Sequence, residues 1–421
     1  MKPHLSRLAG ALALSLSSLL LVPLAAQAAE AARVIVKFKA DSTALRKQVQ
    51  SAAQRHEAQA TALGARLGLA MRAGRGVGEN TQVVFAAGLS SDALAERLSK
   101  EADIEYAVAD RRKTRAAAPN DPLYLSAGAP GASSGGPVAG QWYLRAPNTS
   151  TGVLAAINAE GAWDVPAASS TPVVVAVLDT GVRLDHPDLS GKLLAGYDMV
   201  GEDKTDSGQA LGTFLSAKDG DGRDADPSDM GDGITTVETN TVGGLFYHCT
   251  TPGENGVYTG EPSSWHGTQV SGIIGAATDN GVGMAGVGRE RVRVLPVRVL
   301  AKCGGWDSDI IAGMNWAAGI AVAGVPSNPN PAKVINMSLG GSGSCSAAYL
   351  DVVRAVTAQG AVIVASAGNG AGHAVSEPAN CSGVIGVGGL RHEGDKVGYS
   401  DLGPQVSLSA PAGNCVNTGA S

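Results

Sequence analysis

The chain has 421 residues, a formal net charge of −6 and only 17% charged residues. This length allows two or three domains, one of them large enough to bury a substantial core. The acidic balance provides no basic surface for nucleic acid or for an anionic membrane, so we expect neither as a partner. Glycine is abundant at 57 residues and aromatics are only 4%, which favours an α/β protein that packs small side chains closely.

The first 28 residues are typical of a secretory signal peptide. Lys2 and Arg7 supply a positive start, Leu8 to Val22 supply an apolar stretch, and Ala26 to Ala28 supply a small-residue cleavage site. A membrane anchor is the alternative, but this apolar stretch is short for a membrane span. We therefore expect a secreted chain that begins at Ala29.

Residues 29–115 are predicted to form a small α+β domain. Strand-like and helix-like segments alternate in the order β-α-β-β-α-β, which is that of a ferredoxin-like unit. The strands are expected at 33–40, 66–73, 81–88 and 104–112, and the helices at 42–59 and 91–102. A basic run from Arg111 to Arg115 follows and would form an exposed junction that proteases can cut.

Residues 125–140 are rich in Gly, Ala, Ser and Pro and lack periodicity, which predicts a surface loop. Within them, residues 131–135 read G-A-S-S-G and match the G-x-S-x-G pattern of a nucleophilic serine. That pattern requires a strand before it and a helix after it, and neither is predicted here. We therefore interpret the match as coincidental.

From residue 150 onward, short apolar strands alternate with helices. This alternation predicts an α/β domain, a parallel sheet with helices on both faces. The strands are expected at 173–178, 292–300, 333–338, 361–366, 383–389 and 405–409, and the helices at 266–277, 308–323 and 346–359. Functional residues of such sheets lie beyond the carboxyl ends of the strands.

Three polar residues occupy positions of this kind. Asp179 ends the run V-V-V-A-V-L-D, Asn369 follows the strand A-V-I-V-A-S-A-G, and His266 begins the helix H-G-T-Q-V-S-G. The positive end of a helix dipole disfavours an imidazolium, so His266 makes better sense as a neutral base. Each residue alone also has a structural reading: a cap or turn for Asp179, packing for His266 and a glycine-rich turn for Asn369.

The sequence from Asp179 to Gly181, D-T-G, is also the signature of aspartic proteases. Those enzymes need two carboxylates that share a proton. The chain has no second D-T-G, and the nearest match is N-T-G at 417–419. An aspartic mechanism is therefore disfavoured.

The cysteines are expected to form two disulfides and leave one free thiol, because an exported chain meets oxidising conditions. Sequence alone leaves the connectivity open. Pairing neighbours along the chain gives Cys303–Cys345 and Cys381–Cys415 as our preferred arrangement. Cys249 follows His248, but no further ligand lies at metal-binding spacing, so we expect a solvent-facing thiol or one that pairs downstream.

Residues 219–232 form an acidic segment in which only Arg223 is basic. Oxygen-rich loops of this kind suit calcium, although Met230 stands where an EF-hand would need glutamate. A solvated acidic loop is the alternative. The candidate ligands are Asp219, Asp221, Asp224, Asp226 and Asp229, with Asp232 beside them.

Four blocks then occur in order: V-A-V-L-D-T-G-V, H-G-T-Q-V-S-G-I-I-G, N-M-S-L-G-G and A-S-A-G-N-G. Together they resemble the successive motifs of the subtilisin-like serine proteases (subtilases), over about residues 140–415. The resemblance implies a secreted bacterial endopeptidase in which Asp179 orients His266, His266 is the general base and Asn369 donates to the oxyanion.

The same resemblance implies where a substrate would bind. Ser338, Leu339 and Gly340 would offer an edge strand to the substrate backbone. The segment from Ala365 to Gly368, which includes Ala367, would line the primary specificity pocket. That pocket is uncharged, so we expect a preference for neutral or hydrophobic side chains.

Calcium and a propeptide are implied as well. Asp188 and Asn280, with the carbonyls of Val282 and Met284, match calcium ligands of the family. Residues 29–115 resemble the family's propeptide, which acts as an inhibitor and folding chaperone, and its release is expected near residues 115–116.

One family block is missing, the G-T-S-x-x-A-P sequence that carries the serine. We therefore expect that the peptidase domain, residues 116–421, is truncated before this serine and is inactive as written, since losing the nucleophile costs on the order of 10⁶ in rate. The alternative is a secreted pseudoprotease or peptide-binding module. In both cases we expect a monomer whose partners are protein or peptide substrates and its own propeptide.

Overall fold

The computed structural model describes residues 31–40, 52–78, 80–110, 118–125, 140–166, 169–204, 209–253 and 255–414. Several sequence predictions lie outside these residues: the signal peptide, residues 42–51 of the first predicted helix, the basic junction, the G-A-S-S-G match and Cys415. The chain divides into two compact units, Met1–Thr114 and Arg115–Ser421.

The N-terminal unit is an antiparallel sheet with two helices, and its strand order is β2-β3-β1-β4. Its elements are β1 (Ala32–Phe38), α1 (Ala52–Leu67), β2 (Met71–Gly78), β3 (Thr81–Ala86), α2 (Ser91–Ser99) and β4 (Ile104–Ala109). The ferredoxin-like order of elements is confirmed. The first helix ends later than predicted, because Ala60 and Leu63 continue its buried face and pack on the sheet.

The larger unit is built on a seven-stranded parallel sheet with the order β11-β10-β9-β8-β5-β7-β6. Its strands are β5 (Val173–Asp179), β6 (Tyr197–Asp198), β7 (Val292–Arg298), β8 (Val334–Met337), β9 (Val362–Ser366), β10 (Val384–Leu390) and β11 (Val406–Pro411). All six strands predicted for this sheet are present, and only the short β6 was missed. Strands β6 and β7 lie on one side of β5, and β8 to β11 lie on the other, so the strand order reverses beside β5. Ligands of such sheets bind at this switch point.

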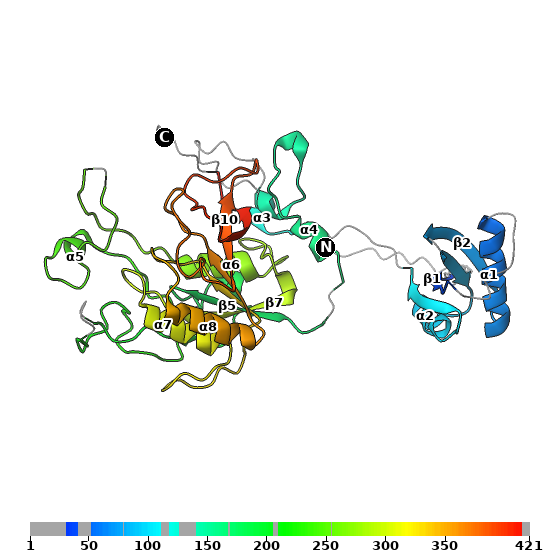
Figure 1. Cartoon of the computed structure of the whole chain (residues 1–421), viewed down its shortest axis with the longest axis horizontal. Coiled ribbons are helices and arrows are strands. Elements are labelled where there is room, and N and C mark those ends of the chain that lie inside the picture. Colours follow the sequence, from blue (N-terminus) through cyan, green and yellow to red (C-terminus); the bar gives the residue numbers. More distant parts are fainter. Residues whose placement is uncertain are drawn as a thin grey trace, which may run out of the picture. The chain divides into compact units, whose positions relative to one another are not determined.

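Three long helices cover both faces of the sheet (Figure 1): α6 (His266–Gly275), α7 (Asp307–Ala317) and α8 (Ala347–Ala358). A Cβ on Gly275 of α6 would contact Val294, whereas one on Gly313 of α7 would contact Val297. Positions 294 and 297 point to opposite faces of β7, because side chains alternate along a strand. Helix α6 therefore packs on one face, while α7 and α8 lie side by side on the other (Figure 1). The shorter helices of the unit are α3 (Pro122–Leu125), α4 (Ala159–Trp163) and α5 (Thr236–Asn240).

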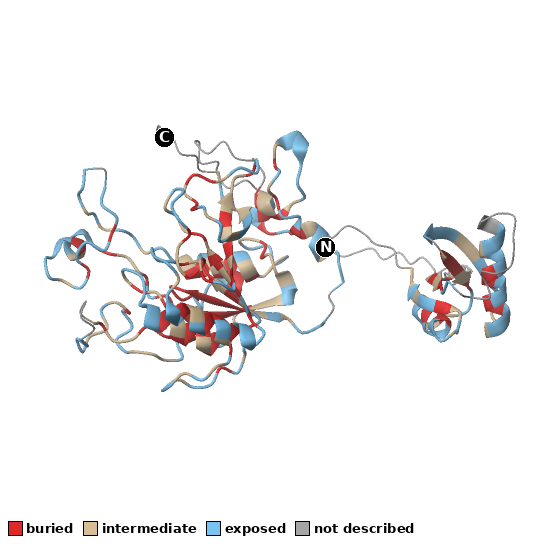
Figure 2. Cartoon of the chain, viewed as in Figure 1, coloured by how far each residue is buried: buried red, intermediate tan, exposed pale blue. Residues whose placement is uncertain are grey.

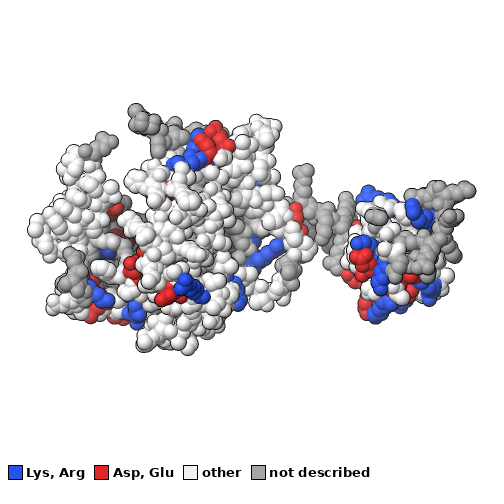
Figure 3. Space-filling view, in the orientation of Figure 1, with Lys and Arg blue, Asp and Glu red and all other residues white. Residues whose placement is uncertain are grey.

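Burial is concentrated in the central strands and in the helix faces that cover them (Figure 2). The main core joins Leu178 and Leu295 of the sheet with Met314 of α7 and Val356 of α8. On the face shown in Figure 3, most of the surface of this unit is uncharged, in line with the low charged fraction of 17%. No helix among the described residues combines the length and apolar character needed to cross a membrane.

Candidate active site

Asp179 and His266 lie against each other at the carboxyl edge of the sheet. Asp179 is the fully buried last residue of β5, and His266 is the half-buried first residue of α6. His266 Nδ1 lies 2.7 Å from Asp179 Oδ1. The helix can start this close to the strand because Gly267 has no side chain: a Cβ there would lie 2.1 Å from the carbonyl oxygen of Gly181.

The charges around His266 favour its protonated form. The hydrogen bond to Asp179 raises the pKa of His266 above its ordinary value, and burial only partly opposes this. The carboxylates of Asp232 and Asp229 act on the pKa in the same direction as Asp179. Because Nδ1 is engaged by Asp179, Nε2 is the ring nitrogen left to exchange a proton with a reacting group.

Thr180 connects the start of α6 to a buried carboxylate. Its Oγ1 donates to Asp229 Oδ2 at 2.7 Å and accepts a hydrogen bond from the backbone N–H of Gly267 at 2.9 Å. The other oxygen of Asp229 accepts from the N–H of Gly231 at 2.7 Å. Sequence analysis did not identify this contact, because 49 positions separate Thr180 from Asp229 and no pattern links them.

A cleft of about 530 Å³ extends from His266 along the segment Ser338 to Gly341. The predicted substrate-binding residues Ser338, Leu339 and Gly340 all line it. The loop after β7, through Leu300, Gly304 and Gly305, contributes further lining. The structure thus places the expected substrate strand next to the histidine.

A second cleft of about 490 Å³ also borders His266 and is lined by the segment Ala365 to Asn369. Ala367 and Gly368, predicted to line the primary pocket, are both part of it, and none of the lining residues is Asp, Glu, Lys or Arg. His266 and Ser338 line both clefts. Asp179, His266, Asn369 and the predicted substrate segments are therefore brought to one edge of the sheet.

Asp401 supports the Asn369 loop and was not found from the sequence. Its Oδ1 accepts a hydrogen bond from the His373 N–H at 3.0 Å, and its own N–H donates to the carbonyl of Gly368 at 3.0 Å. Gly368 has φ +117°, and a Cβ there would lie 2.3 Å from Asp401 Oδ2. Glycine is thus required at this position for both backbone conformation and space.

Two buried carboxylates meet the loop 279–284. Asp188 accepts hydrogen bonds from Asn280 Nδ2 at 2.9 Å and from the Met284 N–H at 2.8 Å. Asp121, which sequence analysis missed, is fully buried and accepts from the Asp279 N–H at 3.0 Å. Neither carboxylate is ion-paired with a Lys or Arg of the described chain.

The chemistry of this group fits calcium. Buried carboxylates without a positively charged partner are costly unless they coordinate a metal. Carboxylate and amide oxygens are the ligands that calcium prefers. Asn280 supplies an amide oxygen close by, which accepts from the Val282 N–H at 2.8 Å. Val282 and Met284, expected to contribute carbonyls, present their N–H groups to Asn280 and Asp188.

The acidic segment 219–232 does not form a shared cage of carboxylates. Most of its carboxylates have local partners instead. Asp219 pairs with Arg298 and accepts from the Asp221 N–H, Asp224 accepts from the Asp226 N–H, Asp226 accepts from Ser228, and Asp232 accepts from Ser264. Among the described residues, one group of three His, Cys, Asp or Glu side chains brings its potential metal-ligand atoms within 4.8 Å of one another. This group is Cys345, Glu377 and Cys381. Its two cysteines are bonded to each other, so it is not a metal site.

The disulfides differ from the expected pairing. Cys249 is bonded to Cys303 and Cys345 to Cys381, so the predicted pairs Cys303–Cys345 and Cys381–Cys415 are wrong. The observed bonds also join cysteines that are neighbours along the chain. The preferred arrangement was wrong because it left Cys249 out of both pairs, whereas the segment before α6 folds back onto the loop after β7 and brings Cys249 to Cys303.

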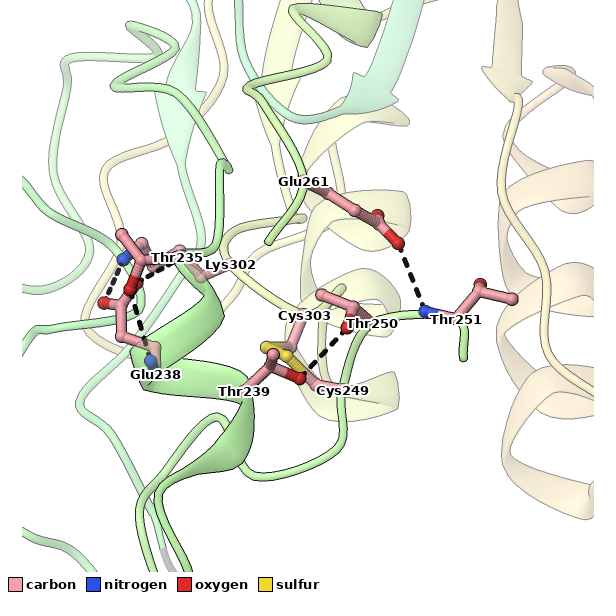
Figure 4. The surroundings of a disulfide bond; sticks show 9 residues. All are labelled: Thr235, Glu238, Thr239, Cys249, Thr250, Thr251, Glu261, Lys302 and Cys303. Carbon is pink, nitrogen blue, oxygen red and sulfur yellow. Dashed lines mark hydrogen bonds and ion pairs between the residues drawn. A yellow bond between two sulfur atoms is a disulfide. The ribbon is translucent and has the colours of Figure 1, made fainter. Parts of the chain in front are cut away.

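Figure 4 shows the surroundings of the Cys249–Cys303 bond. Lys302 pairs with Glu238 at 2.6 Å beside it, and the hydroxyls of Thr239 and Thr250 lie 3.0 Å apart. The disulfide thereby fixes the lining residue Cys303 and the 231–264 segment to each other.

Comparison with known proteins gives consistent matches. The model of the subtilase family matches residues 170–421. An extracellular basic protease of Dichelobacter nodosus is 37% identical over 77% of this chain and 46% of its own length. An extracellular protease of Xanthomonas campestris pv. campestris is 40% identical over 63% of this chain and 40% of its own length. The chain thus spans less than half the length of these two relatives. A solved structure of a protease from Pseudoalteromonas arctica matches with a TM-score of 0.54 and 38% identity, over 70% of this chain and 72% of that one.

Proposed function

The chain belongs to the subtilase family of serine proteases, and from that premise we propose that it provides the acid, the base and the oxyanion donor of a secreted endopeptidase. The observation that carries the proposal is the 2.7 Å contact between Asp179 and His266 at the meeting point of two clefts. An imidazole held this way can take a proton from a nucleophile on one side and lie beside a bound peptide on the other.

Each of the three residues has a distinct role in this proposal. Asp179 holds Nδ1 of His266 and stabilises the imidazolium that forms during the reaction. His266 Nε2 removes the proton of an attacking serine hydroxyl and later gives it to the leaving amine. The side-chain amide of Asn369 donates to the oxyanion of the tetrahedral intermediate, a type of contact worth about 3 kcal/mol in a member of this family.

The serine itself is not assigned to any of the 421 residues, because none stands in a G-T-S-x-x-A-P sequence. We therefore propose that these residues do not hydrolyse peptides by themselves. A secreted module that binds peptides without cutting them is the second candidate, and the two clefts that meet at His266 support peptide binding.

The substrate would lie across both clefts. Its backbone would pair with the segment Ser338 to Gly340, and one side chain would enter the uncharged cleft lined by Ala367 and Gly368. The absence of charged lining residues in that cleft supports a neutral or hydrophobic side chain at this position.

Calcium is proposed as a structural ion held by Asp121, Asp188 and Asn280. It would neutralise two buried carboxylates and tie the loop 279–284 to the residues before the first strand of the larger unit. The N-terminal ferredoxin-like unit is proposed as a propeptide that inhibits the peptidase and assists its folding, and residues 1–28 as the secretion signal.

The test measures hydrolysis of a fluorogenic peptide by the 421-residue chain and by any longer product of the same reading frame. We expect no hydrolysis by the 421 residues and, for a longer product with the serine block, hydrolysis that phenylmethylsulfonyl fluoride and His266→Ala both abolish. Peptide binding without hydrolysis in every product would instead establish the binding-module function.

A further inference from the structure

The cleft along Ser338 to Gly341 is acidic. Asp232, Asp307 and Glu377 line its volume of about 530 Å³, and no Lys or Arg is among its lining residues. The cleft of the proposed primary pocket, by contrast, has no charged lining residue other than the titratable His266. The two clefts that share His266 thus offer a substrate different chemistry.

Two of these carboxylates are held in fixed positions. The backbone of Glu377 exchanges hydrogen bonds with Gly341 at 2.9 and 3.0 Å, and its Oε1 accepts from the Ser346 N–H at 2.6 Å. Asp307 Oδ1 accepts from the hydroxyl of Tyr349 at 3.0 Å. All these partners are neutral, so no cation of the described chain compensates the two charges.

Tyr349 lies where the charges of Asp307 and Glu377 both act. Its side chain is almost completely buried and lines the same cleft. Burial raises the pKa of Tyr349 most strongly, and Asp307 and Glu377 both raise the pKa further through their charges. The two carboxylates therefore direct their negative potential at the same part of the cleft.

Resting on the proposed function, we propose that this cleft is a specificity subsite for a cationic Lys or Arg side chain of the substrate. The peptide backbone would lie along Ser338 to Gly341, and Glu377 and Asp307 would accept charge-assisted hydrogen bonds from the ammonium or guanidinium group. The same potential disfavours an acidic side chain at this position, which adds selectivity by repulsion. The cationic residue is a different one from the neutral residue that occupies the uncharged cleft.

The experiment measures binding of capped fluorescent hexapeptides to the full chain by anisotropy. One lysine is moved along an otherwise neutral sequence, and each peptide is compared with its norleucine counterpart. At one position we expect lysine to bind about tenfold more tightly than norleucine, an advantage that shrinks in 0.5 M salt because salt screens partly exposed charges.

The variants Glu377→Gln and Asp307→Asn, alone and together, identify the groups responsible. Each amide oxygen can still accept the hydrogen bond from Ser346 or Tyr349, so the fold is retained. We expect the lysine advantage to fall below twofold in the double variant. Glu290→Gln, which removes an exposed carboxylate outside this cleft, serves as the matched control and is expected to keep the full advantage.

The outcomes separate this inference from the proposed function. Equal binding of lysine and norleucine peptides at every position would overturn the subsite and leave the peptidase proposal intact. A lysine preference that survives both substitutions would overturn the assignment to Glu377 and Asp307. If no peptide binds even after the chain has been cleaved near residues 115–116 to release the proposed propeptide, the proposed substrate cleft fails together with its subsite. Should the double variant not fold, the single Glu377→Gln variant decides, and an unchanged lysine advantage in it would count against the subsite.

Discussion

Thr180 donates a hydrogen bond to the buried carboxylate of Asp229 at 2.7 Å and thereby links that carboxylate to the first turn of α6. The same hydroxyl accepts from the Gly267 N–H, the residue directly after His266. The position of the proposed base thus depends on a carboxylate that does not touch it. Asp229 also raises the pKa of His266 through its charge, by less than Asp179 and Asp232 do.

Replacing Thr180 with valine should destabilise the larger unit by about 2 kcal/mol, because a buried carboxylate oxygen and an N–H group both lose their partner. Unfolding in urea followed by tryptophan fluorescence measures this, since all five tryptophans lie in the larger unit. The exposed Thr171→Val is the matched control and should change the unfolding free energy little. Equal stabilities of the two variants would show that the Thr180 contact contributes nothing.

Replacing Asp179 with asparagine should lower the pKa of His266, since the hydrogen bond to Asp179 is the largest cause of the raised value. Nuclear magnetic resonance titration of the imidazole measures it, with His266→Gln to assign the signal. Asp232→Asn should lower the same pKa by less, because that carboxylate acts only through its charge. A larger shift in the Asp232 variant would contradict the proposed pairing.

The same pKa shift predicts a pH-dependent stability. The folded-state pKa of His266 lies above its ordinary value of 6.5, so the folded state holds the proton more tightly than the unfolded state. This contribution to stability is fully present below pH 6.5 and is lost as the pH rises through the folded-state pKa. We therefore measure the free energy of unfolding in urea for the wild type and for His266→Gln across this pH range. The wild-type value should fall relative to the variant value as the pH rises, and a constant difference would refute the prediction.

Removing calcium should lower the melting temperature if the proposed ion is bound. Binding at a concentration of about 100 times Kd stabilises the folded state by about 2.7 kcal/mol. The variant Asp188→Asn should lose the response to chelator, whereas Asp226→Asn, in the acidic segment, should keep it. Calorimetric scans with and without a calcium chelator measure both, and a wild type that is indifferent to the chelator would remove calcium from the proposal.

Removing the Cys249–Cys303 bond should destabilise the segment before α6. The disulfide closes a loop with a sequence separation of 54, for which the chain-entropy model gives about 4 kcal/mol. In the Cys249→Ser, Cys303→Ser variant we expect earlier cleavage by a test protease within residues 231–264. Mass spectrometry of the fragments locates the cuts; a cleavage pattern like that of the wild type would show that the ion pair of Lys302 and Glu238 holds the segment without the disulfide.

Much of this protein could be predicted from local sequence patterns. The β-branched run that ends in Asp179, and the apolar periods of α6, α7 and α8, determine their elements through side chains close in sequence. The four ordered motifs likewise identified Asp179, His266 and Asn369 as candidates, and the structure places the first two in direct contact.

Tertiary structure alone decided the contacts between distant segments. Asp229 accepts a hydrogen bond from Thr180, Asp121 and Asp188 both contact the loop 279–284, and Asp401 lies against Gly368. The disulfides likewise join Cys249 to Cys303 and Cys345 to Cys381. Each depends on how a loop returns to the sheet, and that path is set by packing over many residues. Periodicity and spacing describe one segment at a time, so they carry no information on which loops meet.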